Sequence, residues 1–386
     1  MSRRIVFDAT ALALQGYTKG GAYRYGMELL RRLPGALPAD WKLDLYFNFF
    51  RKEHVPRMHE TMEKTGVRAH RCSRVHPRLL RAVHAPAEWT AGACDLFHGP
   101  FDRVPRTRKA ARVVTIHDLA FLRAPEGLPA QWIRELRATV PASARRAHRV
   151  LTVSEFSRRD IVERLQIPAE RVEAIYHGIP ELYAPPQDPQ ADLLRLRARY
   201  GIEPGFVLYL GTLQPNKNIE VLCAAWQILR RRGFPGQLVL AGARGWLYDE
   251  MWARIHARGD DAGVLQTGYL EDQDIRRLYG CCSAFVLVSL LEGFGIPVIE
   301  AMACGAPVVA ADACSLPEVA GGAALIVDPG DAEAIARAIE IAATAGPERD
   351  ALIARGLARS RHFDWDTSAR QHVGAYRRAL EAARAA

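Results

Sequence analysis

The chain lacks any uninterrupted apolar stretch of the roughly 18 residues that a membrane-spanning helix needs, so we expect no transmembrane segment. Basic residues precede apolar ones at the start of the sequence (MSRRIVFDATALAL), an order that also occurs in signal peptides. Asp8 interrupts this apolar run, and the segment is better explained as a first buried strand. We therefore expect a cytoplasmic protein.

Motifs that bind metals are also absent. The seven cysteines are odd in number and form no C-x-x-C pair, so we interpret them as reduced core residues rather than disulfides or zinc ligands. Neither H-E-x-x-H nor a clustered histidine pair occurs. Two Asp-x-Asp strings, at 272–274 and 364–366, stand where helices are expected to begin, and capping explains them better than a metal site. We expect no metal and no cofactor.

Acidic residues are scarce in the first half of the chain. Residues 1–180 carry 31 Lys and Arg against 18 Asp and Glu, a net charge of +13, whereas residues 181–386 carry 21 against 25, a net charge of −4. A basic half indicates an anionic partner, such as lipid phosphate, a membrane surface or nucleic acid. Basic motifs interleaved with aromatic residues are missing, so we expect no nucleic-acid partner. An arginine-rich genome is the alternative explanation of the charge.

The length of 386 residues and a hydrophobic content of 49% are sufficient for two domains with separate cores. In both halves, apolar runs typical of strands alternate with amphipathic stretches typical of helices. This alternation predicts an α/β protein with two Rossmann-like parallel sheets. Four prolines within residues 180–190 predict a linker between them.

The most informative stretch is Glu292–Asp312 (EGFGIPVIEAMACGAPVVAAD). The apolar run before it, Cys281–Leu291, shows no polar alternation and predicts a strand buried on both faces. A glycine-rich turn follows, and Ile296–Cys304 predicts a helix whose N-terminus is suited to bind an anion. Glu292 precedes the turn and Glu300 lies one helical turn beyond it. A capping glutamate and a second glutamate on the solvent face of the helix are the structural alternative.

The two glutamates eight positions apart around Gly-Phe-Gly resemble the E-x7-E motif of retaining GT-B glycosyltransferases of family 4. Gly211–Asn218 (GTLQPNKN) is similar to the phosphate loop of this family, and Gly20–Tyr25 (GGAYRY) is similar to its first glycine-rich turn. His117 follows a β-branched run, where the family has a histidine that faces the donor; a structural hydrogen bond with Asp118 is the alternative. The resemblance covers nearly the whole chain.

This resemblance implies the GT-B fold, in which two Rossmann-like domains face a cleft. Residues 1–185 are expected to form the N-terminal, acceptor-side domain and residues 186–362 the C-terminal domain that binds the nucleotide sugar. Residues 363–386 are expected to form a C-terminal helix that crosses back to the first domain.

The resemblance further implies a retaining, metal-independent glycosyltransferase that moves a hexose. The GTLxPxKN variant is similar to that of bacterial mannosyltransferases of surface polysaccharide assembly, which makes GDP-mannose the first guess for the donor and a lipid-linked or polysaccharide molecule the expected acceptor. Two alternatives remain: a sugar-nucleotide epimerase of the same fold, and a non-catalytic binder of nucleotide sugars or nucleic acid.

The family motifs assign functional roles to three groups of residues. The catalytic group is His117, Lys217 and Glu292. The donor-binding group is Gly211, Thr212, Lys217, Tyr269, Leu270, Glu292, Phe294, Gly295, Ile296 and Glu300. The acceptor-side group is Gly20, Gly21 and Arg24. In this scheme Lys217 stabilises the leaving diphosphate and Glu300 binds the ribose hydroxyls.

The sequence departs from the family pattern at two of these motifs. Thr212 stands where many members have an arginine, which removes a second cation from the donor site and leaves more of the task to Lys217. Tyr23 stands where the first turn often has a third glycine, and its side chain opposes close approach of a ligand to the backbone.

In residues 71–84 (RCSRVHPRLLRAVH), the sequence predicts a short helix from Pro77 on, with a basic side and an apolar side. The arginines of this stretch are Arg74, Arg78 and Arg81. Basic side chains beside an apolar edge suit the surface of an anionic bilayer, which leads to the hypothesis of peripheral membrane binding. An ordinary surface helix packed on the core is the alternative.

Overall fold

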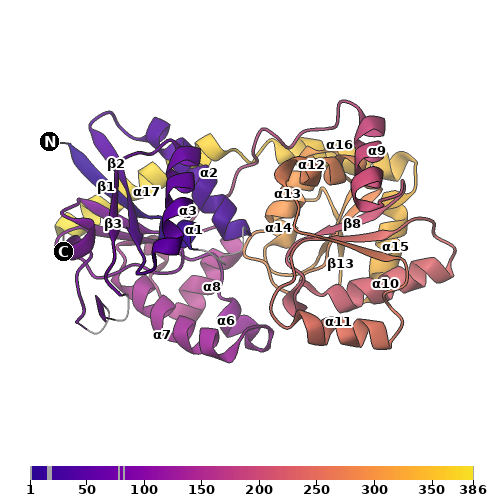
Figure 1. Ribbon diagram of the computed structural model, residues 1–386, viewed down its shortest axis with the longest axis horizontal. Coiled ribbons are helices and arrows are strands. Elements are labelled where there is room, and N and C mark those ends of the chain that lie inside the picture. Colours follow the sequence, from indigo (N-terminus) through magenta and orange to yellow (C-terminus); the bar gives the residue numbers. More distant parts are fainter. Residues whose placement is uncertain (1, 15–19, 77–78, 81–82, 386) are drawn as a thin grey trace. The chain divides into compact units, whose positions relative to one another are not determined.

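The computed structural model describes residues 2–14, 20–76, 79–80 and 83–385. The chain divides into two compact units (Figure 1). Unit 1 comprises Met1–Phe121, Gln131–Gly178 and Asp364–Ala386, and unit 2 comprises Leu122–Ala130 and Ile179–Phe363. The final helix therefore belongs to the first unit, as the expected fold class requires.

Unit 1 is built on a parallel sheet that has seven strands within the described residues, in the order β3-β2-β1-β4-β5-β6-β7. The strands are β1 Arg3–Asp8, β2 Trp41–Asn48, β3 His70–Ser73, β4 Leu96–Gly99, β5 Ala111–Thr115, β6 Arg149–Thr152 and β7 Val172–Ala174. The helices are α1 Thr10–Ala13, α2 Gly21–Ala36, α3 Val55–Thr65, α5 Glu88–Ala91, α7 Ala130–Arg146, α8 Glu155–Leu165 and α17 Trp365–Ala385, and α6 Ala120–Arg123 begins in unit 1 and ends in unit 2. Because the strand order reverses between β1 and β4, this sheet has a switch point at its carboxyl edge, where ligands bind in such folds.

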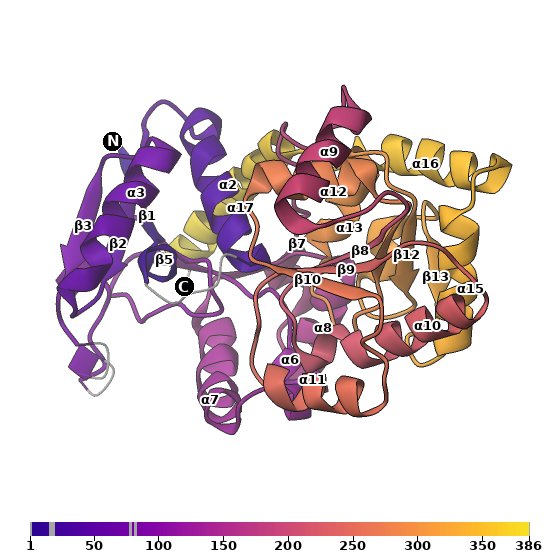
Figure 2. The same ribbon diagram turned by 45° about the vertical axis from the view of Figure 1, so that its right-hand side comes forward.

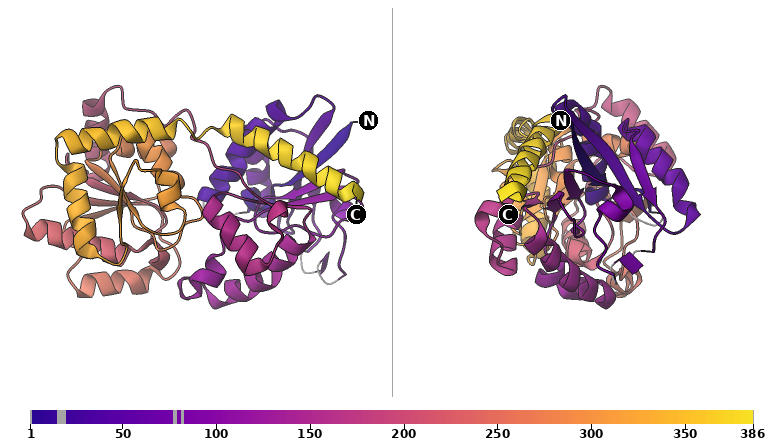
Figure 3. Two further views of the ribbon diagram at one scale, coloured as in Figure 1. Left: turned by 180° about the vertical axis from the view of Figure 1, so that it is seen from behind. Right: turned by 90° about the vertical axis from the view of Figure 1, so that its left-hand side faces the viewer.

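Helix α17 closes the core of unit 1. Its apolar side, which includes Trp365, Val373 and Tyr376, joins the same buried cluster as Phe7 of β1 and Leu29 of α2. Figure 3 shows this helix in yellow, lying along the sheet of unit 1. The last segment of the chain thus completes a core that the first segment begins.

Unit 2 contains a second parallel sheet, with six strands among the described residues in the order β10-β9-β8-β11-β12-β13. The strands are β8 Val207–Leu210, β9 Leu238–Ala241, β10 Val264–Gly268, β11 Ala284–Leu287, β12 Val308–Ala311 and β13 Leu325–Val327. The helices are α9 Pro189–Tyr200, α10 Ile219–Arg231, α11 Tyr248–Ala257, α12 Asp272–Cys281, α13 Ile296–Ala303, α14 Leu316–Ala320, α15 Ala332–Ala343 and α16 Pro347–Ser360. Short 3-10 turns are η1 Lys52–His54 and η3 Ala169–Arg171 in unit 1, and η2 Pro125–Gly127 and η4 Pro215–Lys217 in unit 2.

Helices cover both faces of the second sheet (Figure 2). Helices α10, α11 and α15 pack together on one face, and α9, α12, α13 and α16 pack together on the other. Strands β8, β9, β11 and β12 are consequently buried on both faces, which explains their continuous apolar sequences.

Several sequence expectations need correction. Within residues 51–90, where only a helix from Pro77 on is expected, the structure has α3, β3 and the first residues of α5. The apolar run at 281–291 supplies only the four residues of β11, because Cys281 ends α12 and the chain leaves the sheet after Leu287. The proline-rich linker overlaps α9, which begins at Pro189 behind the capping residue Asp188.

The cysteines are free thiols, but only three of the seven are fully buried: Cys223, Cys282 and Cys304. The expectation that they are mostly core residues is therefore wrong, and Cys72 lies exposed on the edge strand β3. Within the described residues, no helix combines the length and the apolar character needed to cross a bilayer.

A buried hydrogen-bond chain fastens α17 to the first sheet. His372 of α17 places Nδ1 2.8 Å from the carbonyl oxygen of Ser368, which can only accept, so Nδ1 carries the proton of the neutral ring. Its Nε2 therefore accepts a hydrogen bond from the Tyr25 hydroxyl of α2, 3.0 Å away. The Ser368 carbonyl thus fixes the tautomer of His372, and this tautomer fixes the direction of the hydrogen bond between Tyr25 and His372.

The same chain continues into the sheet. The Tyr25 oxygen accepts from Thr115 Oγ1 at 2.9 Å, and Thr115 accepts from His98 Nε2 at 2.9 Å. His98 Nδ1 then accepts from the hydroxyl of Tyr376, back on α17, at 2.8 Å. The two tyrosine hydroxyls keep their acceptors only while His98 and His372 are neutral, because both nitrogens of a protonated imidazole ring are hydrogen-bond donors.

Burial lowers the pKa of His98, His177 and His372, that of His372 from 6.5 to about 4. The unfolded chain therefore binds these protons at higher pH than the folded chain, and stability is complete above pH 6.5 and decreases as the pH falls towards 4. We predict that the thermal midpoint falls over this range. His372→Gln, which keeps an acceptor for Tyr25 but does not titrate, should flatten the decrease, measured by calorimetry across pH.

The exposed His59 provides the matched control, and His59→Gln should leave the slope as it is in the parent. A His372→Gln variant with the parent's pH slope would contradict the role given to the buried chain.

Candidate active site

The candidate donor site of unit 2 lies where β8 and β11 end. Residues 211–218 follow β8, and residues 288–295 follow β11, its neighbour in the sheet. Parallel strands bring these two loops to the same edge, so sequence positions about 75 residues apart become adjacent. A backbone hydrogen bond of 3.0 Å from Leu290 N–H to the Asn216 carbonyl joins the loops directly.

Lys217 and Glu292 form an ion pair across these loops. Lys217 Nζ lies 2.7 Å from Glu292 Oε1, and the two side chains are 17% and 14% exposed. A cation next to a helix N-terminus is electrostatically unfavourable, and the carboxylate of Glu292 offsets this cost at Lys217. The pair holds the ammonium group in place and leaves it enough exposure to meet a ligand.

Asn218 holds the end of the phosphate loop in place through its side-chain hydrogen bonds, although the sequence reasoning gave it no role. Its φ of 60° places it in the left-handed region, which Asn tolerates better than most residues. Its side-chain Nδ2 donates to the carbonyls of Val288, at 3.1 Å, and Pro329, at 2.7 Å. The asparagine thus ties three strand-end loops together and directs the chain into α10.

The turn before α13 is held by close packing. Gly295 has a φ of 97°, and a side chain there would come within 2.6 Å of Leu316 Cδ2. Ser315 Oγ lies 2.9 Å from the carbonyl oxygen of Glu292 and 3.0 Å from that of Phe294. The predicted residues Phe294, Gly295 and Ile296 therefore form one fixed turn, at the N-terminus of α13, where the helix dipole favours an anion.

Glu300 is buried inside α13, with 1% of its surface exposed. The alternative that it lies on the solvent face of the helix is therefore wrong. Tyr279 of α12 donates its hydroxyl to Glu300 Oε2 at 3.2 Å. Two carboxylates of different character thus flank the α13 turn, one paired with lysine and one buried.

The remaining donor-side residues are spread along the sheet edge. Gly211 and Thr212 begin the phosphate loop, and the Thr212 carbonyl accepts from the Tyr209 hydroxyl at 3.2 Å. Tyr269 and Leu270 follow β10, at the far edge of the sheet, where Tyr269 is 53% exposed and Leu270 is buried. They are separated from β8 by β9 and do not join the Lys217 group directly.

Arg244 is a second cation that the sequence reasoning missed. It follows β9 and pairs through its backbone with Leu213 of the phosphate loop, and its guanidinium lies 4.6 Å from the centre of the Tyr248 ring. An arginine is therefore present next to the loop that lacks one at Thr212.

In unit 1, His117 follows β5 and is fixed from several sides. Its Nε2 lies 3.0 Å from the Pro100 carbonyl, so Nε2 donates and Nδ1 of the neutral ring is an acceptor. The Tyr25 ring meets its face edge-on at 5.0 Å, and Asp102 accepts from its backbone N–H at 3.1 Å. Asp118 accepts from the Ala120 N–H at 2.8 Å and begins α6.

The acceptor-side residues lie at the start of α2. Gly20 is the residue before this helix, and Gly21 and Arg24 lie in its first turn. Tyr25, the next residue, contacts His117, so the structure brings this turn and the histidine together at the carboxyl edge of the first sheet.

The two Asp-x-Asp strings lie at helix starts, as expected. Asp364 accepts from the N–H of Thr367 at 2.7 Å and caps α17, while Asp274 in α12 accepts from Arg199, Tyr200 and Arg277. Among the described residues, no group of three or more His, Cys, Asp or Glu side chains is arranged to hold a metal ion.

Comparison with known proteins agrees with this arrangement. A family model for glycosyl transferases group 1 matches residues 195–359, and one for Glycosyltransferase Family 4 matches residues 19–181. The chain is 32% identical over 374 residues to O-antigen chain mannosyltransferase B of Escherichia coli, covering 94% of this chain and 97% of that protein. The chain belongs to the group 1, family 4 glycosyltransferases.

A second curated relative of this glycosyltransferase is the GDP-mannose:cellobiosyl-diphosphopolyprenol alpha-mannosyltransferase of Komagataeibacter xylinus, 27% identical over 178 residues, or 45% of each chain. Among solved structures, Anabaena HepE in complex with UDP and glucose superimposes with a TM-score of 0.71 at 20% identity, covering 96% of this chain and 98% of that one. This likeness shows the GT-B fold, and the family assignment makes the protein a glycosyltransferase enzyme.

We predict that Lys217→Ala lowers kcat about 100-fold or more and raises the KM for the donor less, because negative charge on a leaving diphosphate grows as the glycosidic bond breaks. Steady-state kinetics with varied donor measures both constants. Lys64→Ala removes a lysine from an exposed ion pair with Glu60 and should leave both unchanged. A change in KM alone would restrict Lys217 to binding.

Proposed function

We propose that this glycosyltransferase transfers mannose from GDP-mannose, with retention and without a metal, to a lipid-linked or polysaccharide acceptor. The observation that carries the proposal is the Lys217–Glu292 pair at the N-terminus of α13, a prepared site for a diphosphate. The names of two relatives support the sugar: both are mannosyltransferases, and one names GDP-mannose and a diphosphopolyprenol.

In this proposal the diphosphate binds against Lys217 and the start of α13, which together stabilise the charge that develops as the sugar leaves. An ammonium group and a helix dipole supply this stabilisation without a divalent cation. Glu292 neutralises Lys217 before the donor arrives and is then released to meet the hydroxyls of the sugar. No side chain acts as a nucleophile, and the acceptor hydroxyl attacks on the face from which the diphosphate departs.

His117 contributes to the sugar side of the reaction in this proposal. Its ring is oriented by Pro100 and Tyr25, and the neutral ring offers Nδ1 as an acceptor for a sugar hydroxyl. Glu300 takes the ribose hydroxyls of the nucleotide, and Gly20, Gly21 and Arg24 line the acceptor side.

Incubation of the purified enzyme with radiolabelled GDP-mannose and a polyprenyl-diphosphate-linked oligosaccharide tests the proposal, with UDP-glucose as the matched donor. We expect label in the lipid fraction from GDP-mannose only, an α-anomeric product by NMR, and the same rate in EDTA. A converted nucleotide sugar without transfer would instead identify an epimerase, and a β-linked product would exclude retention.

We also propose that unit 1 binds an anionic membrane surface next to the edge strand β3. Four large apolar side chains in this region are exposed: Phe50 66%, Leu79 58%, Val83 53% and Trp89 59%. Phe50 follows β2, and Trp89 lies in α5, which packs on β3. Arg108 lies over the Trp89 ring, 5.7 Å from its centre. Arg51 directly follows Phe50 in the sequence, and Arg74 directly follows β3. Arg78 and Arg81, the other arginines of the predicted basic face, lie outside the described residues.

Exposed aromatic side chains with a basic rim are typical of a membrane-binding surface. We predict that Phe50→Ser combined with Trp89→Ser reduces co-sedimentation with vesicles that contain one quarter phosphatidylglycerol, at low salt. Trp132→Ser, which removes a tryptophan that is 43% exposed on α7, is the control and should sediment like the parent. Unchanged sedimentation of the double variant would exclude this surface.

A further inference from the structure

Glu300 is a carboxylate in an otherwise apolar helix. Its neighbours in α13 from Val298 to Met302 are buried, and Glu300 itself is only 1% exposed. The charge of Glu300 adds to burial in raising the pKa of the Cys304 thiol, one turn further along. With so little surface exposed, a small rotation of the side chain decides whether a carboxylate oxygen can meet a ligand.

Tyr279 supplies a hydrogen bond that orients this carboxylate. Its hydroxyl lies 3.2 Å from Glu300 Oε2, and the residue is completely buried. The ring is wedged edge-on between Tyr183, at 5.9 Å, and Phe285 of β11, at 5.3 Å. A donor held this rigidly sets the position of its acceptor, because neither ring nor hydroxyl has room to follow a moving carboxylate.

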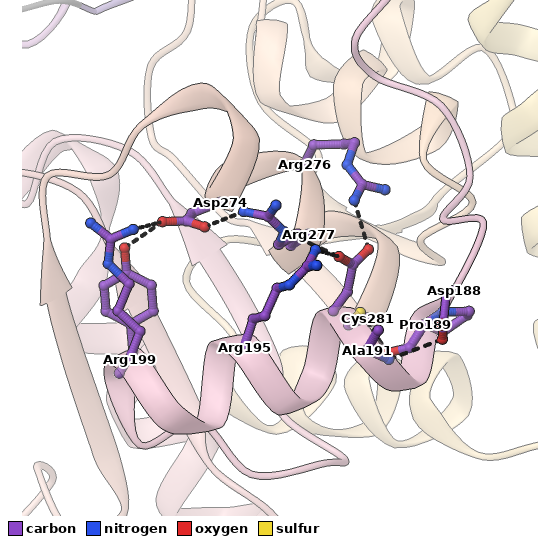
Figure 4. A network of polar contacts seen from close by, with 11 residues as sticks. Asp188, Pro189, Ala191, Arg195, Arg199, Asp274, Arg276, Arg277 and Cys281 are labelled. Atoms are coloured by element: carbon purple, nitrogen blue, oxygen red, sulfur yellow. Dashed lines mark hydrogen bonds and ion pairs between the residues drawn. The ribbon is translucent and has the colours of Figure 1, made fainter.

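Helix α12, which carries Tyr279, is itself fixed by charge. Figure 4 shows Arg276 and Arg277 of α12 reaching towards α9. Both bind the buried carboxylate of Asp192 on α9, at 2.6 Å and 3.1 Å. Buried carboxylates that are shared among arginines cost stability when one partner is lost, so the relative position of the two helices is strongly specified.

A second carboxylate, on α12 itself, also joins α9 and α12. Asp274 of α12 is also buried and bonds Arg199 and Tyr200 of α9, at 3.0 Å and 2.6 Å, and Arg277 of its own helix at 2.6 Å. These contacts hold the first and second turns of α12 against α9. They thereby also fix the position of its C-terminal turn, in which Tyr279 contacts Glu300 of α13.

We propose that Tyr279 is a positioning residue for the donor site: it orients Glu300 so that one carboxylate oxygen meets the ribose of the nucleotide, and the α9–α12 ion pairs hold it in place. This inference rests on the proposed function, in which Glu300 binds the ribose hydroxyls. It makes Tyr279 important for the nucleoside part of the donor and not for departure of the diphosphate.

Tyr279→Phe tests the proposal, because it keeps the packed ring and removes only the hydroxyl. We expect the Kd for GDP, measured by calorimetry, to rise about threefold to tenfold, the loss that one hydrogen bond typically causes. The donor KM should rise by the same factor while kcat stays at the parent value. With 2′,3′-dideoxy-GDP, parent and variant should bind equally, because the hydroxyls that Glu300 meets are missing.

Tyr46→Phe is the matched control, since Tyr46 is a buried tyrosine of unit 1 whose hydroxyl bonds Thr90 at 2.7 Å. It should leave GDP affinity unchanged. Asp192→Asn, which weakens the pairing of α9 with α12, should raise the Kd for GDP in the same direction as Tyr279→Phe.

The Glu300→Ala variant separates the two ways in which the proposal can fail. If Glu300→Ala weakens GDP binding and Tyr279→Phe does not, the positioning role of Tyr279 is overturned while the proposed function stands. If Glu300→Ala leaves GDP binding unchanged, or if the parent binds neither GDP nor UDP, the donor role of Glu300 is overturned and the inference with it. An equal loss with 2′,3′-dideoxy-GDP would also overturn it, because the effect would then lie outside the ribose.

Discussion

The ion pair between Lys217 and Glu292 is the interaction on which the candidate site depends. It joins the loops that follow β8 and β11, and it does so with partly exposed side chains at 2.7 Å. In a largely buried pair of this kind, the cost of removing both charges from water offsets much of their attraction, so its net contribution to stability is small. Its importance lies in its location, because it fixes the ammonium group of Lys217 against Glu292, four residues before the start of α13.

The backbone around this pair is organised to keep the two loops in register. Asn218 binds two strand-end carbonyls, Ser315 bonds the carbonyls of the α13 turn, and Gly295 occupies a conformation that a side chain would obstruct. These contacts use buried polar groups, which are costly when unpaired. The backbone of the two loops is therefore held in place without a ligand, and donors held in this way are what electrostatic stabilisation of a leaving group would require.

In unit 1, the main structural requirement is that the last helix of the chain, α17, packs in one defined position against the sheet. The apolar face of α17 fills the core, but a directed chain of side-chain hydrogen bonds through His372, Tyr25 and His98 selects the register of the helix against the sheet. Tyr25 also meets the ring of His117. The docking of α17 and the orientation of the candidate catalytic histidine thus share one side chain.

The sequence by itself determined the fold class, the family and most of the central motif. Short apolar runs without alternation favour strands of a sheet covered on both faces, and glycine beside glutamate at the end of such a run indicates a ligand-binding edge, so local patterns were sufficient to locate β8, β11 and α13. They were not sufficient for residues 51–90 or for the length of β11, where burial comes from partners distant in the chain.

Only the tertiary structure decided that Glu292 pairs with Lys217, that Glu300 is buried beneath Tyr279, that Arg244 joins the phosphate loop and that four titratable side chains connect α17 to the sheet. The contacts Lys217–Glu292, Tyr279–Glu300, Leu213–Arg244 and Tyr25–His372 link residues 21 to 347 positions apart, and no periodic pattern along the chain encodes a contact that exists only once strands and helices have packed together.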